Sequence, residues 1–484
     1  MKKLFLIFLS CISIVSFSQS SINWTAGMNI ASNSYGNYYP RITTEASGNP
    51  LVIWSRSSDA SVFISRWNGT SFTTPVKVNP SWLTVASGSW MGPDIASKGD
   101  TVYVVMKQTP EADTASHIYG VRSFDGGITF SPPGRIDFIG DSISRFPTVT
   151  TDAAGNPIVG FMKFNSSFLD SRWVVTKSNN YGNTFSTDVK ASGWSGAGAV
   201  VCDCCPGAIT CSGNSVAMLY RDNLSNVRDM WAGISSDGGN SFPQGIPVDQ
   251  KNWVIPACPA SGPDGVIIGD TLYTAFMSGA GGSNLVYLSK SSLSSMTGST
   301  GIRVTGTFAG LTQQNYPRIA GAGNALAIAW KQIVNGGDQL ALRFTSNIAN
   351  GFSAGYDTVD LNDITNTDVA ITNGNIFIVW EDDASGTVKY RAGTFTPTTS
   401  VNETISENQF SVFPNPTTGG FTVYDLPSEA GYELKITNMI GETVLQKTGN
   451  HKEETINLNG RSGIYFLEII SGQQSLTRKL IVTH

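Results

Sequence analysis

The sequence has few charged residues and very few histidines. Charged residues make up 14% of its 484 residues, where an average globular protein has about 25%, and the formal net charge is −5. Because there is no long basic run to neutralise phosphates, we expect no nucleic-acid partner. Two of the three histidines lie in the last 34 residues, which leaves His117 alone in the body of the chain. A histidine-rich metal centre and a Ser-His-Asp triad are therefore disfavoured, and we expect no cofactor.

Long apolar runs are also scarce. The first, residues 4–17, follows Lys2 and Lys3 and precedes small and polar residues, which predicts a secretory signal peptide over residues 1–20. The run is shorter than the roughly 20 residues that a membrane-spanning helix needs. No other stretch is apolar enough to cross a bilayer, so we expect an exported chain without a transmembrane segment.

Glycine-rich turns and short alternating strands repeat along residues 39–383. Each unit has a proline, a short strand, a Gly or Asn turn and an apolar strand, and no stretch of ten or more residues shows helical periodicity. The units align on Pro40, Pro93, Pro147, Pro206, Pro259 and Pro317, with Thr367 at the same place in a seventh unit. Their intervals are 53, 54, 59, 53, 58 and 50 residues, and four-stranded units of this length are typical of β-propeller blades.

We therefore predict an all-β fold with a β-propeller over residues 21–397. Seven blades are favoured, and six are the alternative if one unit is an insertion. Residues 23–30 are similar to the fourth strand of a unit, and the seventh unit ends one strand short. We expect the N-terminal strand to complete the last blade, because this closes the ring and removes an exposed sheet edge.

Three segments share the pattern Ser-x-Asp/Asn-x-Gly-x-Thr/Ser-Phe between the expected third and fourth strands of a unit. Their matching residues are Ser123, Asp125, Gly127, Thr129 and Phe130; Ser178, Asn180, Gly182, Thr184 and Phe185; and Ser235, Asp237, Gly239, Ser241 and Phe242. The pattern resembles the Asp boxes, or bacterial neuraminidase repeats, of sialidase-like β-propellers. The expected role is structural, because the Asp or Asn caps its own turn, the Gly supplies a positive φ and the aromatic ring fills the space between sheets.

The C-terminal part has a different composition. A linker over residues 398–408 is rich in Thr, Ser, Asn and Glu, and residues 409–484 form short alternating strands. In the runs 413–419, 438–441, 463–467 and 479–482 this segment resembles the type A sorting domain of the type IX secretion system. The resemblance implies a Bacteroidota source, an immunoglobulin-like β-sandwich, the secretion machinery as partner, and an extracellular or outer-membrane-surface location. The alternative is a small sandwich with a binding role of its own.

Charged and aromatic residues flank the aligned prolines, where a propeller's inner strands converge on its axis. The residues after the prolines include Arg318, Asp368, Arg41 and Asp94 in ring order, and those before them include Tyr39 and Tyr316. Two interpretations stay open. The charges form ion pairs that hold neighbouring blades together, or some arginines face an anionic or sugar ligand, with the tyrosines as stacking surfaces.

Sialidases resemble this layout and carry an arginine cluster, a Tyr/Glu nucleophile and an Asp acid, with an Arg-Ile-Pro motif on an inner strand. The most similar run here is Arg145-Phe146-Pro147, in the third unit rather than the first. The nucleophile pair and the acid have no matching positions in this sequence. The resemblance therefore makes Arg145 a candidate catalytic residue and exo-sialidase activity an alternative function.

Five of the six cysteines lie outside the expected signal peptide, namely Cys202, Cys204, Cys205, Cys211 and Cys258. Because Cys205 and Cys258 precede aligned prolines of adjacent units, we expect a disulfide Cys205–Cys258 or Cys204–Cys258, with Cys202–Cys211 as a local possibility. We predict no metal, although a thiolate site for copper(I) or zinc and a reactive thiol are alternatives.

Four charged residues follow the cysteine-rich segment, namely Arg221, Asp222, Arg228 and Asp229. Two interpretations stay open. The four residues line one pocket together with the cysteine-rich segment, or they form ion pairs with one another, and we favour the ion pairs.

Three functions are compatible with these features. The favoured one is a secreted or cell-surface propeller that binds a glycan or protein ligand at the axial mouth. The alternatives are an exo-sialidase-like glycoside hydrolase and a cysteine-based metal or redox protein. They differ in whether the chain retains its ligand, cleaves it or holds a metal.

Overall fold

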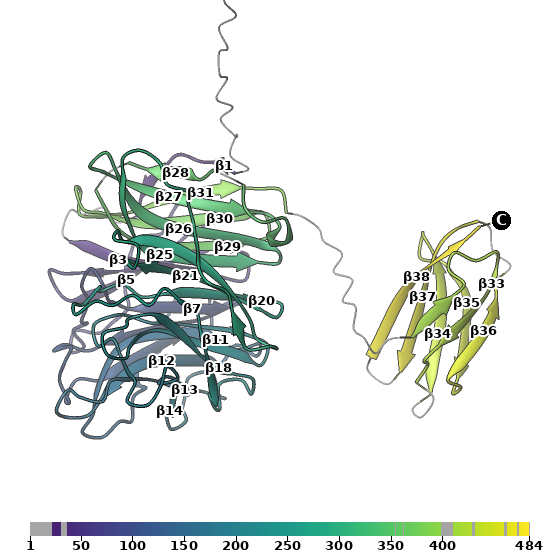
Figure 1. Ribbon diagram of the computed structural model, residues 1–484, viewed down its shortest axis with the longest axis horizontal. Coiled ribbons are helices and arrows are strands. Elements are labelled where there is room, and N and C mark those ends of the chain that lie inside the picture. Colours follow the sequence, from purple (N-terminus) through teal and green to yellow (C-terminus); the bar gives the residue numbers. More distant parts are fainter. Residues whose placement is uncertain are drawn as a thin grey trace, which may run out of the picture. The chain divides into compact units, whose positions relative to one another are not determined.

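The computed structural model describes residues 22–30, 36–353, 355–361, 363–397, 410–427, 431–458, 462–471 and 474–483. The expected signal peptide and linker lie outside these ranges. The chain divides into two compact units, residues 1–399 and 400–484 (Figure 1). In the described part of the chain, regular structure is almost entirely β-strand, with one short 3-10 helix, η1 (Ile348–Asn350).

Seven antiparallel sheets make up the described part of the first unit, and we number them as blades in chain order. Blade 1 has β3 (Asn37–Thr44), β4 (Pro50–Arg56), β5 (Ser61–Arg66) and β6 (Val76–Lys77). Blade 2 has β7 (Asp94–Lys98), β8 (Thr101–Lys107), β9 (Ile118–Ser123) and β10 (Gly134–Arg135). Blade 3 has β11 (Ile143–Thr151), β12 (Pro157–Phe164), β13 (Arg172–Lys177) and β14 (Val189–Lys190).

The next four blades follow the same plan. Blade 4 has β15 (Val200–Val201), β16 (Ala208–Ser212), β17 (Ser215–Asn223), β18 (Met230–Ser235) and β19 (Gln244–Pro247). Blade 5 has β20 (Asp264–Ile268), β21 (Thr271–Ser278), β22 (Leu285–Ser292), β23 (Thr297–Gly298) and β24 (Ile302–Arg303). Blade 6 has β25 (Leu311–Ala322), β26 (Ala325–Val334), β27 (Gly337–Thr345) and β28 (Asp357–Asp360). Blade 7 has β29 (Ile364–Thr372), β30 (Asn375–Asp382), β31 (Thr387–Thr394), β1 (Asn23–Trp24) and β2 (Met28–Asn29).

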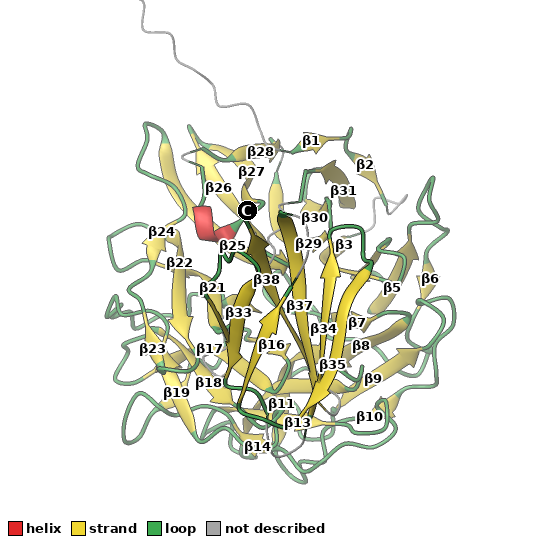
Figure 2. Ribbon diagram, turned by 90° about the vertical axis from the view of Figure 1, so that its right-hand side faces the viewer, coloured by secondary structure: helices red, strands yellow, loops and turns green. Residues whose placement is uncertain are grey.

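The inner strands of the blades form a closed ring. Contacts run from β3 to β7, β11, β16, β20, β25 and β29 in turn, and β29 packs against β3 again. Figure 2 shows the blades around this ring, with strands such as β6, β10 and β19 at its edge. The N-terminal strand closes blade 7, because β1 pairs with β31 through Asn23 opposite Thr394 and β2 pairs with the same strand. The predictions of seven blades and of this closing strand are confirmed.

Stacking of the blades buries both faces of their central strands. All four residues of the run 51–54 in β4 are buried. Ile53 and Ile64 of blade 1 belong to the same core cluster as Val104 of blade 2, so each core lies between two sheets. A strand covered on both faces reads as a continuous apolar run, which is why alternation is weak in these segments.

The Ser-x-Asp/Asn segments form tight turns between the third and fourth strands of blades 2, 3 and 4. In blade 2, Oδ1 of Asp125 accepts the N–H of Ile128 at 3.0 Å and that of Thr129 at 2.9 Å, while Oγ of Ser123 accepts the N–H of Gly127 at 2.9 Å. Burial raises the pKa of Asp125, but hydrogen bonds from the hydroxyls of Ser123 and Thr129 and from the N–H groups of Thr129 and Ile128 outweigh it and lower the pKa to about 2. The same pattern recurs in the other two turns, where Gly182 and Gly239 have φ values of 76° and 85°.

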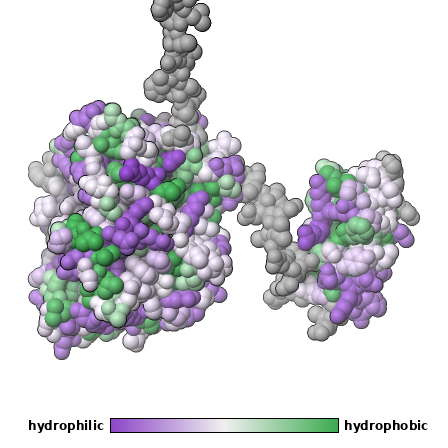
Figure 3. All heavy atoms as spheres, viewed as in Figure 1, coloured by the Kyte–Doolittle hydropathy of each residue, from purple (hydrophilic) through white to green (hydrophobic). Residues whose placement is uncertain are grey.

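The described part of the second unit is a β-sandwich, as predicted for the C-terminal segment. One sheet has β32 (Ser411–Phe413), β33 (Gly420–Tyr424) and β36 (Glu453–Asn457). The other has β35 (Thr443–Gly449), β34 (Tyr432–Asn438), β37 (Gly463–Ser471) and β38 (Gln474–Val482). Phe421 and Ile456 of the first sheet share one core with Leu434 and Leu467 of the second. On the faces seen in Figure 3, hydrophilic and hydrophobic residues are interspersed on both units.

Blades 4 and 5 approach each other closely at Gly262. A Cβ atom added there would lie 2.0 Å from the carbonyl oxygen of Pro206 and 2.8 Å from its carbonyl carbon. We expect Gly262→Ala to lower the free energy of unfolding by roughly 1–3 kcal/mol, because the backbone must shift to relieve the overlap. Gly306→Ala is the control, since nothing lies within 4 Å of the Cβ added at that position. Chemical unfolding followed by circular dichroism measures both, and equal losses would contradict the close approach.

Candidate functional site

The inner strands of the propeller surround a pocket on its axis. The pocket encloses about 660 Å3 of space, including the part open to solvent. Its lining includes five of the six residues that the sequence places at the axial mouth, namely Tyr39, Arg41, Asp94, Tyr316 and Arg318. The sixth residue, Asp368, contacts Arg318. The topology thus brings the six residues together.

A β-bulge shapes the inner strand at the pocket. In β3, Tyr39 and Pro40 lie opposite a single residue of β4, Trp54. The first bulge residue has a positive φ in four blades, at Tyr39 (55°), Phe146 (50°), Tyr316 (50°) and Asn366 (55°). This conformation is unfavourable for residues other than glycine, so contacts with neighbouring strands have to hold it.

Aspartates that follow the aligned proline position bind the next blade. Oδ2 of Asp94 in blade 2 accepts the N–H of Val149 at 2.9 Å and the hydroxyl of Thr148 at 2.8 Å, both in blade 3. Oδ2 of Asp368 in blade 7 accepts the N–H of Ile42 in blade 1 at 2.9 Å. Each carboxylate therefore joins two inner strands through a backbone donor.

Asp264 has the same role in blade 5, although the repeat alignment does not single it out. Strand β20 begins at this residue, and its Oδ2 accepts the N–H of Ile319 in blade 6 at 2.9 Å. The aligned proline of blade 5 is therefore Pro263, and the assignment to Pro259 is wrong. The signal was present, because Gly-Pro-Asp occurs at 92–94 and again at 262–264.

This correction also changes the expected position of Cys258. With Pro263 as the aligned proline, the two intervals that meet at blade 5 become 57 and 54 residues, closer to the others. Cys258 then lies in the loop before β20. The prediction that Cys205 and Cys258 share one register in adjacent blades is wrong.

The two arginines of the pocket have different partners. Nε of Arg318 lies 2.9 Å from Oδ1 of Asp368 and 3.3 Å from Oδ2 of Asp264. Burial lowers the pKa of Arg318, but these carboxylates outweigh it and raise the pKa above its usual value. Arg41 instead lies with its guanidinium carbon 3.8 Å from the centroid of the Tyr39 ring, and its Nη1 donates to the carbonyl oxygen of Pro40 at 2.7 Å. Among the residues that the structure describes, no ion pair neutralises Arg41.

Trp90 lines the same pocket and is not marked by the repeat pattern. It lies in the connection between β6 and β7, and 39% of its surface is exposed. The sequence offered one indication of this residue, because Trp82 and Trp90 are two tryptophans in one long connection between blades. The pocket therefore combines aromatic side chains with an unpaired arginine.

Arg145 is not among the residues that line the pocket. Its Nε pairs with Glu111, and its Nη1 donates to the carbonyl oxygen of Asp203 at 2.7 Å. Its guanidinium carbon lies 4.5 Å from the ring centroid of Phe146. These contacts hold Arg145 within the protein, so the geometry does not support the substrate contact that the sialidase resemblance implies.

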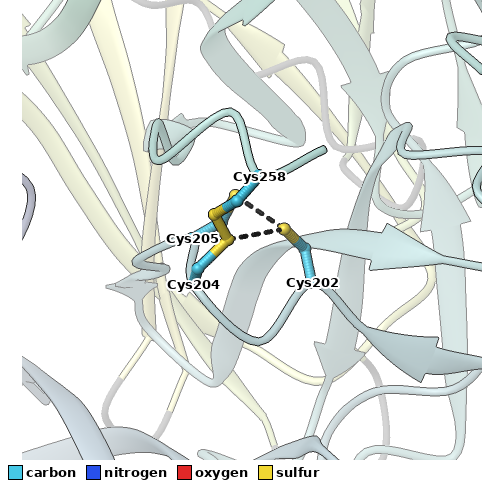
Figure 4. Close-up of side chains that lie close together, drawn as sticks. All are labelled: Cys202, Cys204, Cys205 and Cys258. Atoms are coloured by element: carbon cyan, nitrogen blue, oxygen red, sulfur yellow. Dashed lines mark hydrogen bonds between the residues drawn. A yellow bond between two sulfur atoms is a disulfide. The ribbon is translucent and has the colours of Figure 1, made fainter. Parts of the chain in front are cut away.

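Three of the four cysteines of blade 4, namely Cys202, Cys204 and Cys205, meet Cys258 (Figure 4). A disulfide joins Cys204 to Cys258, which is one of the two expected pairings. Cys202 and Cys205 are buried free cysteines whose Sγ atoms are 2.8 Å apart. Cys211 is also free and lies on β16, with its Sγ 3.5 Å from the carbonyl oxygen of Gly213. The Cys202–Cys211 pairing is therefore not formed.

The two buried thiols differ in acidity. The hydrogen bond with Cys205 lowers the pKa of Cys202 against the effect of burial, and the nearby Arg228 and Arg221 lower it further. Burial raises the pKa of Cys205 well above its ordinary value. Cys202 is therefore the more acidic of the pair.

Arg221, Asp222 and Arg228 are not among the residues that line the axial pocket. Arg221 is fully buried and donates to the carbonyl oxygens of Ser261 at 3.1 Å and Met277 at 2.8 Å, both outside its own blade. This arginine therefore links blade 4 to the segment around blade 5 through backbone acceptors.

The expected ion pairs among these charged residues are absent from the described part of the chain. Asp222 accepts a hydrogen bond from the hydroxyl of Ser195, and burial raises its pKa to about 6. Asp229 accepts the N–H groups of Asn252 at 2.8 Å and Trp253 at 2.9 Å. Both aspartates therefore have uncharged donors.

No curated protein sequence is significantly similar to this chain. The chain is similar in structure to a protein of unknown function from Dyadobacter fermentans, with 10% identity, coverage of 78% of this chain and 99% of that one, and a TM-score of 0.46. It is similar to an α-L-arabinofuranosidase from Fusarium graminearum at 12% identity, with 68% and 99% covered and a TM-score of 0.49. An ulvan lyase has 11% identity, 76% and 93% coverage and a TM-score of 0.49.

The C-terminal unit gives the clearer match. Residues 411–483 match the model of the secretion system C-terminal sorting domain. Among the described residues, no helix has the length and apolarity to cross a bilayer. The chain is therefore a β-propeller protein that a type IX sorting domain directs to the cell surface or the extracellular space.

Proposed function

We propose that the exported propeller binds an acidic glycan at its axial pocket, with Arg41 as the contact for the acid group. The proposal rests on the surroundings of Arg41. Arg41 lines the pocket and is only 6% exposed, and it has no acidic partner among the described residues. A desolvated cation without a counter-charge is unfavourable, so a ligand that brings a carboxylate or sulfate is favoured there.

The carboxylates near Arg41 already have donors. Oδ1 of Asp94 accepts the N–H of Ile95 at 3.0 Å, and its Oδ2 accepts two donors from blade 3. Asp368 binds the inner strand of blade 1 and Arg318. Because these contacts hold the acceptors in place, the carboxylates are not free to move to Arg41.

Aromatic side chains support a sugar as the body of the ligand. Tyr39, Trp90 and Tyr316 all line the pocket, and Trp90 is the most exposed of the three. Aromatic rings bind apolar faces, and a small number of polar groups then fix the ligand's orientation. A glycan offers both an apolar ring face and polar substituents. Binding of a protein ligand instead is a second possible outcome of the test below.

The proposal is binding without bond cleavage. Most glycoside hydrolases use two carboxyl groups that flank the scissile bond, whereas sialidases use a Tyr nucleophile together with an acid. In the described pocket lining, Asp94 is the one carboxylic acid, and its oxygens are hydrogen-bonded to the backbone. Arg145, the candidate catalytic residue of the exo-sialidase alternative, lies outside this lining, so the pocket lacks the contact that this alternative assigns to it.

We expect Arg41→Met to lower affinity for acidic glycans at least tenfold, because it removes a charge-assisted hydrogen bond of about 1.5–3 kcal/mol while keeping a side chain of similar length. The measurement is binding of the mature chain to immobilised uronate, sialoside and sulfated oligosaccharides, with their neutral counterparts beside them.

Arg56→Met is the matched control, because Arg56 lies in the same blade but pairs with Asp59. It should bind as the unsubstituted chain does. Equal binding of acidic and neutral glycans, or an Arg41→Met variant with full affinity, would refute the proposal. Binding of acidic peptides alone would replace the glycan with a protein ligand.

Glu381 holds two strained residues at the rim of the pocket. Its Oε2 accepts the N–H of Tyr39 at 3.1 Å and the side-chain amide of Asn366 at 2.9 Å. Both residues have a φ of 55°. Burial, with a smaller contribution from Asp383, raises the pKa of Glu381 to about 7. The folded protein therefore holds this proton at pH values where the unfolded chain has lost it.

This raised pKa predicts a stability that depends on pH. The stabilisation that Glu381 contributes to the folded protein is fully present below the pKa of Glu381 in the unfolded chain, near 4.5. It is lost as the pH rises through the folded-state pKa of about 7. We expect the melting temperature to fall between pH 5 and pH 8, and the fall to be smaller in Glu381→Gln. Thermal unfolding in that range measures it. Glu45→Gln is the control, since hydrogen bonds lower the pKa of Glu45 despite burial and it stays ionised throughout. Parallel curves for Glu381→Gln and the unsubstituted chain would rule out the assigned titration.

A further inference from the structure

Blade 4 differs from blade 1 in the length of its inner bulge. Strand β15 ends at Val201, opposite Asp222, and β16 resumes at Ala208, opposite Leu219. Six residues, 202–207, therefore lie opposite two residues of β17, whereas in blade 1 two residues lie opposite one. Bulges re-aim side chains next to functional sites. Three of the six residues in this enlarged bulge are cysteines.

The sulfur atoms of four cysteines meet at the enlarged bulge. Cys202, Cys204 and Cys205 come from the bulge and Cys258 from the loop before β20, and their Sγ atoms all lie within 4.8 Å of one another. Figure 4 shows the four side chains directed toward a common centre. Cys202 and Cys205 are buried, while Cys258 is exposed and gives the cluster a side open to solvent. A single disulfide needs two sulfur atoms, so it does not account for this convergence.

Two arginines border the cluster. Nη1 of Arg228 lies 3.0 Å from Sγ of Cys202, and its Nε donates to the carbonyl oxygen of Ile255, which lies in the loop that carries Cys258. The carbonyl oxygen of Arg221 accepts the N–H of Cys202 at 2.9 Å. Positive charge beside a sulfur favours the thiolate, and the thiolate is the form that binds metal ions. The surroundings therefore suit a set of anionic sulfur ligands.

We propose that the reduced cluster binds one thiophilic d10 metal ion, Zn2+ or Cu+, through Cys202, Cys204, Cys205 and Cys258. Thiolate sulfur is a preferred donor for both ions, and four thiolates around one ion is a common structural zinc site. A tetrahedron with zinc–sulfur distances of about 2.3 Å places its sulfur atoms roughly 3.8 Å apart. The Sγ atoms of Cys202 and Cys204 are 3.6 Å apart, close to this spacing, and all four sulfur atoms lie within 4.8 Å of one another.

Binding is coupled to the redox state of the disulfide. A dithiol reductant gives two electrons and two protons to the Cys204–Cys258 bond and becomes a disulfide itself, which leaves four thiols in the cluster. Zn2+ then displaces four protons and forms a centre of charge −2, while Cu+ displaces one proton from each thiol that it binds. The guanidinium groups of Arg228 and Arg221 offset the negative charge. With the disulfide intact, two sulfur atoms are unavailable as thiolates.

This metal site is independent of the proposed glycan contact. None of the four cysteines lines the axial pocket, although Pro206, which follows Cys205, does. Metal content and glycan affinity are therefore separate readouts.

The test uses the mature chain, reduced with excess dithiol without oxygen, incubated with Zn2+ or Cu+ and then freed of unbound ion. Metal is measured by inductively coupled plasma mass spectrometry. We expect about one ion per reduced chain and at least tenfold less in the oxidised chain, because four thiolates saturate one tetrahedral ion. Co2+ in place of Zn2+ should give the intense visible bands of a tetrahedral thiolate complex.

Variants separate this cluster from cysteines in general. The metal content of the reduced Cys202→Ser variant, and of the variant Cys258→Ser at the exposed residue, should be at least tenfold lower than that of the unsubstituted chain. Cys211→Ser should keep the full metal content, since Cys211 lies outside the cluster. Circular dichroism on each variant checks the fold, and Cys258→Ser guards against a folding failure of the buried Cys202→Ser. Retention of Zn2+, Cu+ or both supports the proposal and identifies the ion. A reduced chain that holds neither, or equal metal in all three variants, overturns it.

Discussion

The propeller depends on carboxylates that cross from one inner strand to the backbone of the next. Asp94, Asp264 and Asp368 each accept the N–H of a residue two positions beyond the aligned proline of the following blade. Near the axis the strands cannot pair with one another as a sheet, so their N–H groups need other acceptors, and a buried N–H without one is costly. A charged acceptor makes these strong hydrogen bonds, and the seven sheets close into a ring around them.

Two blades depart from the others at positions that carry chemistry. Blade 1 has Arg41 at the position where blades 2, 5 and 7 have aspartate, and this places an unpaired cation in the axial pocket. Blade 4 has Gly207 at that position and an enlarged bulge before it, which carries three cysteines. The first departure supports the glycan proposal and the second supports the metal proposal.

The export route sets the conditions under which these sites work. The sorting domain directs the chain to the cell surface or the extracellular space, where disulfides persist. The Cys204–Cys258 disulfide is the form that such an environment favours, and Cys258 is an exposed residue. The buried thiols of Cys202 and Cys205 are shielded by comparison, because reactivity of a thiol requires access as well as acidity.

The sequence alone determined the repeat, the closing strand and the sorting domain and favoured seven blades over six, because these depend on local patterns that recur or match along the chain. It also placed Tyr39, Arg41, Asp94 and Arg318 near one another, since repeat register converts sequence position into position around an axis. Their partners were decided by the tertiary structure. Whether Arg41 or Arg318 is neutralised depends on which carboxylate crosses from another blade, and Asp264 was missed because an extra Cys-Pro pair precedes it in the chain. The meeting of Cys258 with the cysteines of blade 4 was likewise decided by loop conformation, because contacts between distant segments are set by packing and not by local spacing.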